Sequence, residues 1–268
     1  MSATTTAMPA SGIRPTFGRV VRSEWIKLRT LRSTLWVAAI TIVVMAAFAG
    51  LFAWAVTSFP DGAPTGSGVL VVGYPIAQLT IAVLGALVVT GECATGSFRS
   101  TLAAEPRRMR VVVSKALVVL AAAFAVSVLA LALSAAVALP VLSAGGLDVD
   151  FGGDDIRALV GAVLYLTVSA WFAFGIGLLV RNTAAAITTV VGLLFILPII
   201  VQIIAATTGA QWLWDLYQYL PAPAGSAVIS GDVTGTGALE PWTGFAVFCG
   251  YTAVLLAAGS LAFSRRDD

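Results

Sequence analysis

Six stretches of about twenty uncharged, mostly apolar residues dominate the sequence and restrict the folds open to it. The first, residues 35–56, would form about 33 Å of helix at a rise of about 1.5 Å per residue, enough to cross a hydrocarbon core of about 30 Å. Only 10% of the 268 residues are charged and 59% are hydrophobic, too few charges to cover a water-soluble domain of this size. We expect an all-α, polytopic membrane protein with spans at residues 35–56, 69–90, 116–138, 159–180, 184–206 and 243–263, which together form one transmembrane domain over residues 35–263.

Proline and short connections predict how these spans begin and end. Pro75 predicts a kink near the outer end of the second span, and Pro140 is expected to close the third apolar stretch. Only residues 181–183 separate the fourth and fifth spans, so these two helices should be antiparallel neighbours. Residues 1–15 are small and polar, lack the pattern of a signal peptide and are expected to be disordered.

The placement of the basic residues predicts the orientation of the chain. If both termini are cytoplasmic, the inner segments, including the tail at residues 264–268, hold fourteen of the fifteen lysines and arginines, and only Arg157 lies outside. Short loops rich in Lys and Arg stay in the cytoplasm. We therefore expect a multi-pass protein of a bacterial plasma membrane with both ends inside.

Residues 16–34 have the pattern of an amphipathic helix that lies in the membrane interface. Apolar residues recur at helical spacing from Phe17 to Leu31, and basic residues flank them. The residues expected to make contacts are Trp25, Lys27, Leu28 and Arg29. Two surfaces can receive this helix, the anionic membrane surface and a partner protein, and the pattern fits both.

The long charged segment between two spans, residues 91–115, predicts a short cytoplasmic helix. Ser97 is a suitable N-cap, Phe98 and Leu102 share one face at i and i+4, and Pro106 ends the helix. Such a helix is shaped to sit in a groove of a partner. The alternative is an ordinary loop whose arginines only fix the topology.

The connection at residues 207–241 is much longer than most. It opens with an aromatic cluster that is typical of the membrane interface, and continues through a Leu-Pro segment in which we expect a turn at residues 221–225. Trp212 and Trp214 belong to this cluster, and Leu220 and Pro221 to the Leu-Pro segment.

Several kinds of chemistry are excluded or disfavoured by the residues that the chain lacks. Histidine is absent, which removes histidine-based acid–base catalysis and His–zinc sites. No phosphate-binding Gly-x-x-x-x-Gly-Lys motif occurs, the spans hold no Asp or Glu, and the two cysteines have no metal-ligand company. Gln78 and Gln202 remain as polar residues inside spans, where each can form a helix–helix hydrogen bond or contact a substrate.

Three segments, in this order and spacing, resemble the bacterial ABC type-2 permeases. They are Ser23–Thr34 running into the first span, Gly91–Glu92 with Thr95–Leu102 and Pro106–Arg108 in the first cytoplasmic loop, and Tyr219–Pro221 with Gly225 before the last span. The resemblance implies that this loop is a coupling helix that docks on a separate ATPase. It also implies that the segment before the last span lines the outer end of the pathway, where the outer-gate candidates are Trp212, Trp214, Leu220 and Pro221. The coupling candidates are Glu92, Ser97, Phe98, Arg99, Leu102, Arg107 and Arg108.

The resemblance implies that the chain is the permease subunit of an ATP-driven exporter and has no catalytic or metal site of its own. Two copies would pair with each other and with two ATPase subunits, which would bind ATP and Mg. Membrane lipid is the other expected partner, and nucleic acid is not. The apolar spans favour a hydrophobic or amphipathic substrate such as a drug, lipid or peptide antibiotic. The alternative is a non-transporting anchor or sensor subunit that docks an ATPase.

Overall fold

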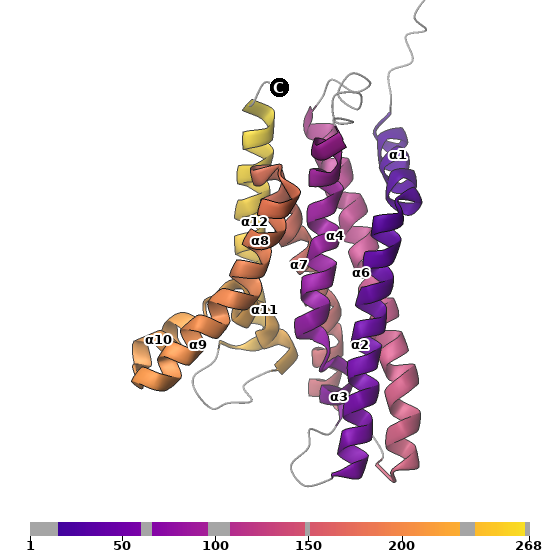
Figure 1. Ribbon diagram of the computed structural model, residues 1–268, viewed down its shortest axis with the longest axis vertical. Helices are drawn as coiled ribbons and strands as arrows, with labels where there is room; N and C mark the ends of the chain where they lie inside the picture. The colour runs from indigo at the N-terminus through magenta and orange to yellow at the C-terminus, as the bar shows by residue number, and fades with distance from the viewer. Residues whose placement is uncertain (1–15, 60–65, 96–107, 148–150, 231–238, 266–268) are drawn as a thin grey trace, which may run out of the picture.

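Six helices in the computed structural model are long and apolar enough to cross a membrane, as the apolar runs predicted. The structure describes residues 16–59, 66–95, 108–147, 151–230 and 239–265. Every regular element in these ranges is a helix, and the chain ends at 16 and 265 lie at the same end of the molecule (Figure 1). The elements are α1 (Phe17–Thr30), α2 (Arg32–Ser58), α3 (Ser67–Val71), α4 (Tyr74–Thr95), α6 (Arg108–Ala144), α7 (Gly153–Val180), α8 (Thr183–Val191), the π-helix η1 (Gly192–Ile196), α9 (Leu197–Thr208), α10 (Gln211–Tyr217), α11 (Pro221–Ser230) and α12 (Pro241–Arg265).

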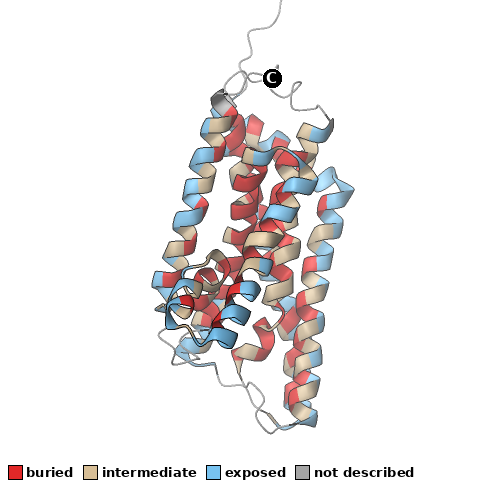
Figure 2. Cartoon of the chain, turned by 60° about the vertical axis from the view of Figure 1, so that its left-hand side comes forward, coloured by how far each residue is buried: buried red, intermediate tan, exposed pale blue. Residues whose placement is uncertain are grey.

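Helix α7 is the centre of the fold. It packs against α4, α6, α11 and α12, and the buried residues in Figure 2 gather along the middle of the bundle. Small residues allow this closeness: a Cβ atom at Gly85 of α4 would lie 1.9 Å from the carbonyl oxygen of Ala170. Large aromatic side chains, among them Tyr165, Phe172 and Phe174, fill the remaining space around α7.

Residues 17–30 form α1, in the segment where an amphipathic helix is expected. Val20, Glu24 and Leu28 are buried on its inner face, and the helix packs mainly against α6. Leu31 has an extended backbone conformation and separates α1 from α2. The position of α1 relative to a membrane stays a prediction.

The second span is broken rather than kinked, and the break precedes Pro75. Short α3 ends at Val71, a turn follows at residues 72–73, and α4 begins at Tyr74. Gly73 is needed there because a Cβ would lie 3.0 Å from the Cα of Met45 in α2. Pro75 then stands in the first turn of α4, where a missing amide removes no intrahelical hydrogen bond.

Pro140 does not close the third helix, contrary to the prediction. Helix α6 passes through it and ends at Ala144. The apolar residues beyond it keep the helix going, because Leu142 is 2% exposed and packs in one cluster with Ala49 and Ala53 of α2. In this position tertiary packing outweighs the helix-breaking effect of proline.

The expected turn at residues 221–225 is also wrong, since Pro221 begins a helix. Pro221 and Pro223 both fall in the first turn of α11, where proline costs no hydrogen bond. The small residues of α11 let it enter the bundle between α7 and α12. A Cβ on Gly225 would lie 2.6 Å from ring atoms of both Tyr165 and Phe248.

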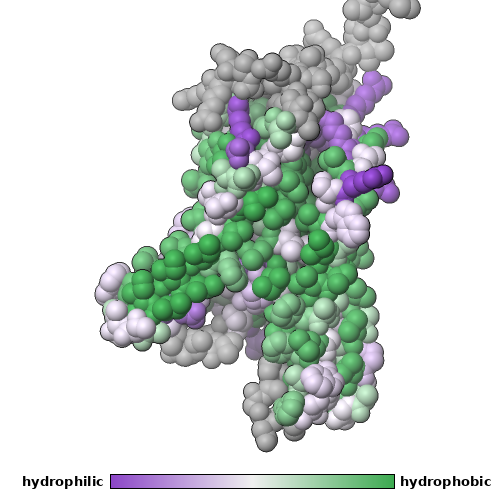
Figure 3. All heavy atoms as spheres, in the orientation of Figure 1, coloured by the Kyte–Doolittle hydropathy of each residue, from purple (hydrophilic) through white to green (hydrophobic). Residues whose placement is uncertain are grey.

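The fifth span leaves the bundle part-way along its length. It starts in the tight connection that was predicted: Arg181 adopts a left-handed conformation with φ 55°, and the Asn182 side chain caps α8 by accepting from the amide of Ala185 at 3.0 Å. Helix α8 packs against α4 and α7, but α9 packs mainly on η1 and α10. We call α9 and α10, residues 197–217, the arm; it projects sideways in Figure 1, and Figure 3 shows its surface as largely hydrophobic.

Candidate functional site

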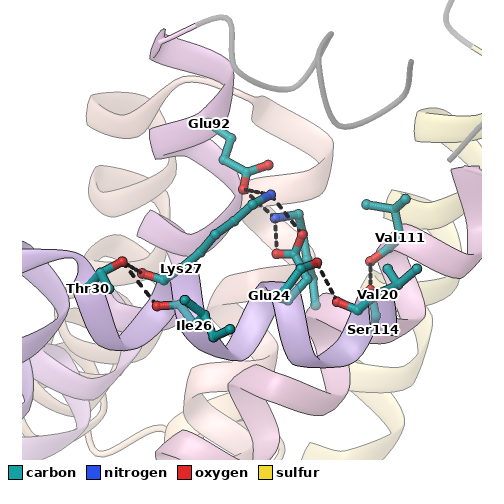
Figure 4. A network of polar contacts seen from close by, with 10 residues as sticks. Val20, Glu24, Ile26, Lys27, Thr30, Glu92, Val111 and Ser114 are labelled. Atoms are coloured by element: carbon teal, nitrogen blue, oxygen red, sulfur yellow. Dashed lines mark hydrogen bonds and ion pairs between the residues drawn. The ribbon is translucent and has the colours of Figure 1, made fainter. Parts of the chain in front are cut away.

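A closed ring of four charged side chains joins three helices at the end of the bundle that carries residues 16 and 265. Figure 4 shows it from close by, with Glu24, Lys27 and Glu92 labelled. Glu24 and Lys27 come from α1, Glu92 from the last turn of α4 and Lys115 from the second turn of α6. Positive and negative groups alternate around it, so the ring has no net charge when all four are ionised. These four residues are called the charge ring below.

Each lysine of the charge ring bridges both glutamates. Lys115 Nζ lies 2.5 Å from Glu24 Oε2 and 2.7 Å from Glu92 Oε1. Lys27 Nζ lies 3.0 Å from Glu24 Oε1 and 3.2 Å from Glu92 Oε1. Glu24 therefore uses one carboxylate oxygen for each lysine, which fixes the rotation of α1 relative to α6.

Burial makes this geometry energetically important. The Lys115 and Glu24 side chains are only 2% and 3% exposed, whereas Lys27 is 41% exposed. An unpaired buried charge is strongly unfavourable, and removing one partner of a buried pair costs about 3–5 kcal/mol. Burial alone would lower the pKa of Lys27, but the hydrogen bonds and charges of Glu24 and Glu92 outweigh it and hold that pKa above its usual value.

Apolar contacts and one indole hydrogen bond hold the helices around the charge ring. Leu28 of α1 packs with Val118 and Ala122 of α6, next to the half-buried Trp25. The indole of Trp171 in α7 donates to the carbonyl of Ala116, one residue after Lys115, at 2.7 Å. The start of α6 is thereby attached to α7 as well as to α1 and α4.

The charge ring flanks the segment predicted to dock on a partner. Glu92 lies three residues before the end of α4, and Lys115 lies seven residues after the start of α6. Of the coupling candidates, Glu92 is in the ring and Arg108 begins α6, but its side chain is not described. Ser97, Phe98, Arg99, Leu102 and Arg107 lie outside the described residues, so the predicted coupling helix stays a prediction.

The structure distributes the other predicted site residues over separate places. On α1, Trp25 and Leu28 face α6, Lys27 is in the charge ring and Arg29 is exposed. Trp212 is 65% exposed on α10, and Trp214 stacks edge-on against Tyr217 with ring centres 6.0 Å apart. Leu220 is half-buried just before Pro221, in the cluster that joins α9 and α10.

The two glutamines predicted as pathway candidates have opposite environments. Gln78 of α4 is 3% exposed, and its side chain contacts Tyr165 of α7 and the Leu194 carbonyl of the fifth span. Gln202 is exposed on α9. The structure does not bring them into one site.

Two members of the charge ring were not recognised as site residues from the sequence. Lys115 is the only charge between residues 111 and 139, and Glu24 is the only acid between residues 16 and 34. An ionisable group inside an apolar run needs an opposite charge, so Lys115 was a signal, whereas Glu24 has basic neighbours in its own helix. Sequence alone could not pair them, because they lie 91 positions apart.

The charge ring has the groups to hold helices together, two lysines and two glutamates from three helices. Within the described ranges, no group of three or more His, Cys, Asp or Glu residues is placed to hold a metal ion. The ring is a mechanical connection between α1, α4 and α6.

Comparison with known proteins identifies the architecture. None of the curated proteins matches the chain. Residues 19–268 match the family described as "ABC-2 family transporter protein", which covers all six spans and the charge ring. The chain therefore belongs to the ABC-2 family of transporter proteins and is a multi-pass membrane permease of an ABC transporter.

Proposed function

We propose that this chain is the permease of an ATP-driven exporter whose ATP is bound and hydrolysed by a separate subunit. Two copies of the permease, alike or different, enclose the pathway and are driven by two ATPase subunits. Closure of the ATPase dimer displaces residues 96–107, and the permeases then rearrange between inward-open and outward-open states. The substrate is hydrophobic or amphipathic, because the spans and the arm offer mainly apolar surface.

The observation that carries the proposal is the position of the charge ring. The ring joins α4, which precedes residues 96–107 in the chain, to α6, which follows them, and to α1. Because the charge ring joins α4 to α6, a displacement of one of these helices is passed to the other. A displacement of residues 96–107 by an ATPase is thus passed to two spans at once.

The coupling assignment is tested with Phe98→Ala combined with Leu102→Ala, which keeps every charge. If both side chains fill a groove on the ATPase, each truncation removes a buried apolar contact of about 1–3 kcal/mol, and assembly weakens at least about tenfold. Co-purification of the ATPase with the permease measures this.

The matched control is Arg107→Ala with Arg108→Ala, which changes charge in the same segment. It should retain more of the ATPase than the apolar pair does. Undiminished assembly of the Phe98/Leu102 variant would rule out the coupling helix. Assembly without substrate-stimulated ATP hydrolysis by the wild type would favour a non-transporting anchor subunit.

The proposed location is a bacterial plasma membrane with both termini in the cytoplasm. With six spans, both termini and the connections after the second and fourth spans lie on the same side of the membrane. Fourteen of the fifteen basic residues fall in these segments, which supports the proposed orientation. An impermeant thiol reagent should reach a cysteine placed at the exposed Arg19 only from the cytoplasm, and one at Asp150 or Asp232 only from outside. Labelling of the Arg19 position in intact cells overturns this orientation.

The aromatic residues and the Leu-Pro segment are proposed to gate the outer end of the pathway. Replacing Leu220 and Pro221 should lower export while the ATPase still co-purifies. Trp212 and Trp214 are tested in the same assay. Loss of the whole complex, with the permease still folded, would show that the segment holds the assembly together instead.

A further inference from the structure

The fifth span contains an irregular turn at the point where the arm leaves the bundle. Residues 192–196 form the π-helix η1, and Pro198 stands in the first turn of α9. In a continuous α-helix the amide of residue 198 would donate to the carbonyl of Leu194, four residues earlier. Proline has no amide, and its ring crowds that same carbonyl. The Leu194 carbonyl therefore lacks its usual α-helical donor.

A side chain from another helix supplies a donor to this carbonyl. Gln78 Nε2 of α4 lies 3.5 Å from Leu194 O, a long contact in a place where both residues are buried. Tyr165 of α7, which is fully buried, donates its hydroxyl proton to Gln78 Oε1. With its oxygen held by Tyr165, the amide of Gln78 has its nitrogen directed at Leu194.

The two helices that present Gln78 and Tyr165 are closely packed. At Gly85 the backbones of α4 and α7 leave no space for a side chain. Gln78 is also on the helix that carries Glu92 of the charge ring, fourteen residues further along. That separation is about 21 Å along an α-helix. The α4–α7 pair thus extends from the charge ring to the irregular turn.

The arm joins the bundle at two places, the irregular turn and the far end of α10. At the far end, residues 218–220 lead from α10 into α11, and the Tyr251 hydroxyl of α12 donates to the carbonyl of Tyr219 at 3.0 Å. Helix α9 packs mainly on η1 and α10. Its own cluster, Val201, Ala205 and Leu213, joins α9 to α10 rather than to the bundle. The contact at Leu194 therefore lies at one of these two places, where a change in the turn alters the direction in which α9 leaves the bundle.

We propose that Gln78 is a positioning residue that fixes the angle of the arm by replacing the amide absent at Pro198. When Gln78 holds the Leu194 carbonyl, the π-turn is stable and the arm keeps one direction. When α4 shifts and the contact is lost, the turn relaxes and the arm moves relative to the α4–α7 pair. The use of this motion in transport rests on the proposed function, but the positioning itself belongs to the permease alone.

The test is a distance measurement between the arm and the bundle in the full-length permease in lipid nanodiscs. Spin labels are attached to cysteines at Ile203 on α9 and Val160 on α7, both exposed, after Cys93 and Cys249 have been changed to serine. Dilution with unlabelled protein removes distances between copies. We expect one narrow distance for the otherwise unchanged chain and loss of that narrow distance in Gln78→Met, which keeps the length of the side chain but has no amide.

The decisive variant adds Pro198→Ala to Gln78→Met. Alanine restores a backbone amide opposite the Leu194 carbonyl, so the double variant should regain one narrow distance, shifted if the span straightens. Gln202→Met is the matched control, since Gln202 is an exposed glutamine on the arm itself, and it should leave the distance unchanged. A double variant as broad as Gln78→Met, or an unchanged distance in Gln78→Met, overturns the proposal.

Tyr165→Phe keeps the comparison informative if Gln78→Met does not fold. This variant retains Gln78 and the aromatic ring at residue 165 but removes the hydroxyl that binds the amide oxygen of Gln78. It should also lose the narrow distance between the labels. An unchanged distance in Tyr165→Phe also overturns the proposal. In the complex with the ATPase, Gln78→Met should keep assembly and lose substrate transport. If the wild-type complex transports nothing while the distance results hold, the proposed function fails and the positioning role stands.

Discussion

The central helix α7 and the fifth span, whose outer part belongs to the arm, are both strongly apolar, yet they are held in different ways. In α7, 72% of the most apolar window is buried, against 22% in the fifth span, although only two residues separate α7 from α8. The bundle face of α7 carries small and polar residues such as Tyr165, Ser169 and Gly175. The arm presents Ile199, Ile203 and neighbouring isoleucines outward. Hydropathy alone therefore finds a span, and small or polar residues reveal which spans pack inside.

The largest loss is expected from breaking the charge ring, which fixes the bundle. Lys115→Met removes the ammonium group that contacts the buried Glu24 carboxylate and the 15% exposed Glu92 carboxylate, and should lower the free energy of unfolding by about 3–5 kcal/mol. Thermal unfolding in detergent measures the change.

Two further variants show whether charge pairing is the cause. Arg29→Met removes an exposed positive charge from α1 and should have little effect. Glu24→Gln added to Lys115→Met removes an opposite pair and should recover part of the loss. Equal stability of Lys115→Met and wild type contradicts the pairing.

The second-largest loss of stability is expected at the close backbone contact between α4 and α7. Gly85→Ala places a methyl group 1.9 Å from the Ala170 carbonyl oxygen, and because backbone atoms cannot easily yield, we expect a loss of about 3 kcal/mol. The control is Gly250→Ala in α12, where the added Cβ meets nothing within 4 Å. It should be neutral or stabilising by up to about 1 kcal/mol. Similar stabilities of the two variants would show that α4 and α7 are not closely packed.

A smaller and local effect is expected in the arm. Leu213 is 7% exposed and joins α10 to α9. Leu213→Ala should lower the free energy of unfolding by about 2 kcal/mol, a small loss for a buried Leu→Ala change. Hydrogen exchange should accelerate in residues 197–217 and stay unchanged in α7, because the arm opens without the bundle. Ile203→Ala, 57% exposed on the same arm, should change exchange little. Faster exchange throughout α7 would show that arm and bundle unfold together.

The smallest effect is the pH dependence at Lys27. Its raised pKa means that the folded chain holds the proton more tightly than the unfolded one. Its contribution is fully present below the usual value of 10.5 and is lost as the pH rises through the higher folded value. The stability difference between wild type and Lys27→Met should therefore stay constant across neutral and mildly alkaline pH. A difference that falls with pH near neutrality contradicts the raised pKa.

The sequence predicted the number and the kind of spans because each depends on one local property, the length of an apolar run. It was wrong wherever packing between distant segments decided the outcome. Pro140 and Pro221 are local helix signals whose effects depend on Leu142 and Gly225 fitting against other helices. The charge ring was missed for the same reason: Glu24, Glu92 and Lys115 are isolated in sequence and become partners only when α1, α4 and α6 meet.

The charge ring also makes the chain its own chemical reporter. Lys27 and Lys115 are the only two lysines, so apart from the amino terminus an amine-reactive reagent has no other primary amine to modify. Lys27 is 41% exposed and Lys115 is 2% exposed, so mild acylation of the native protein should modify the first and spare the second. Acetylation of Lys115, read by mass spectrometry, then records each occasion on which α1 and α6 separate.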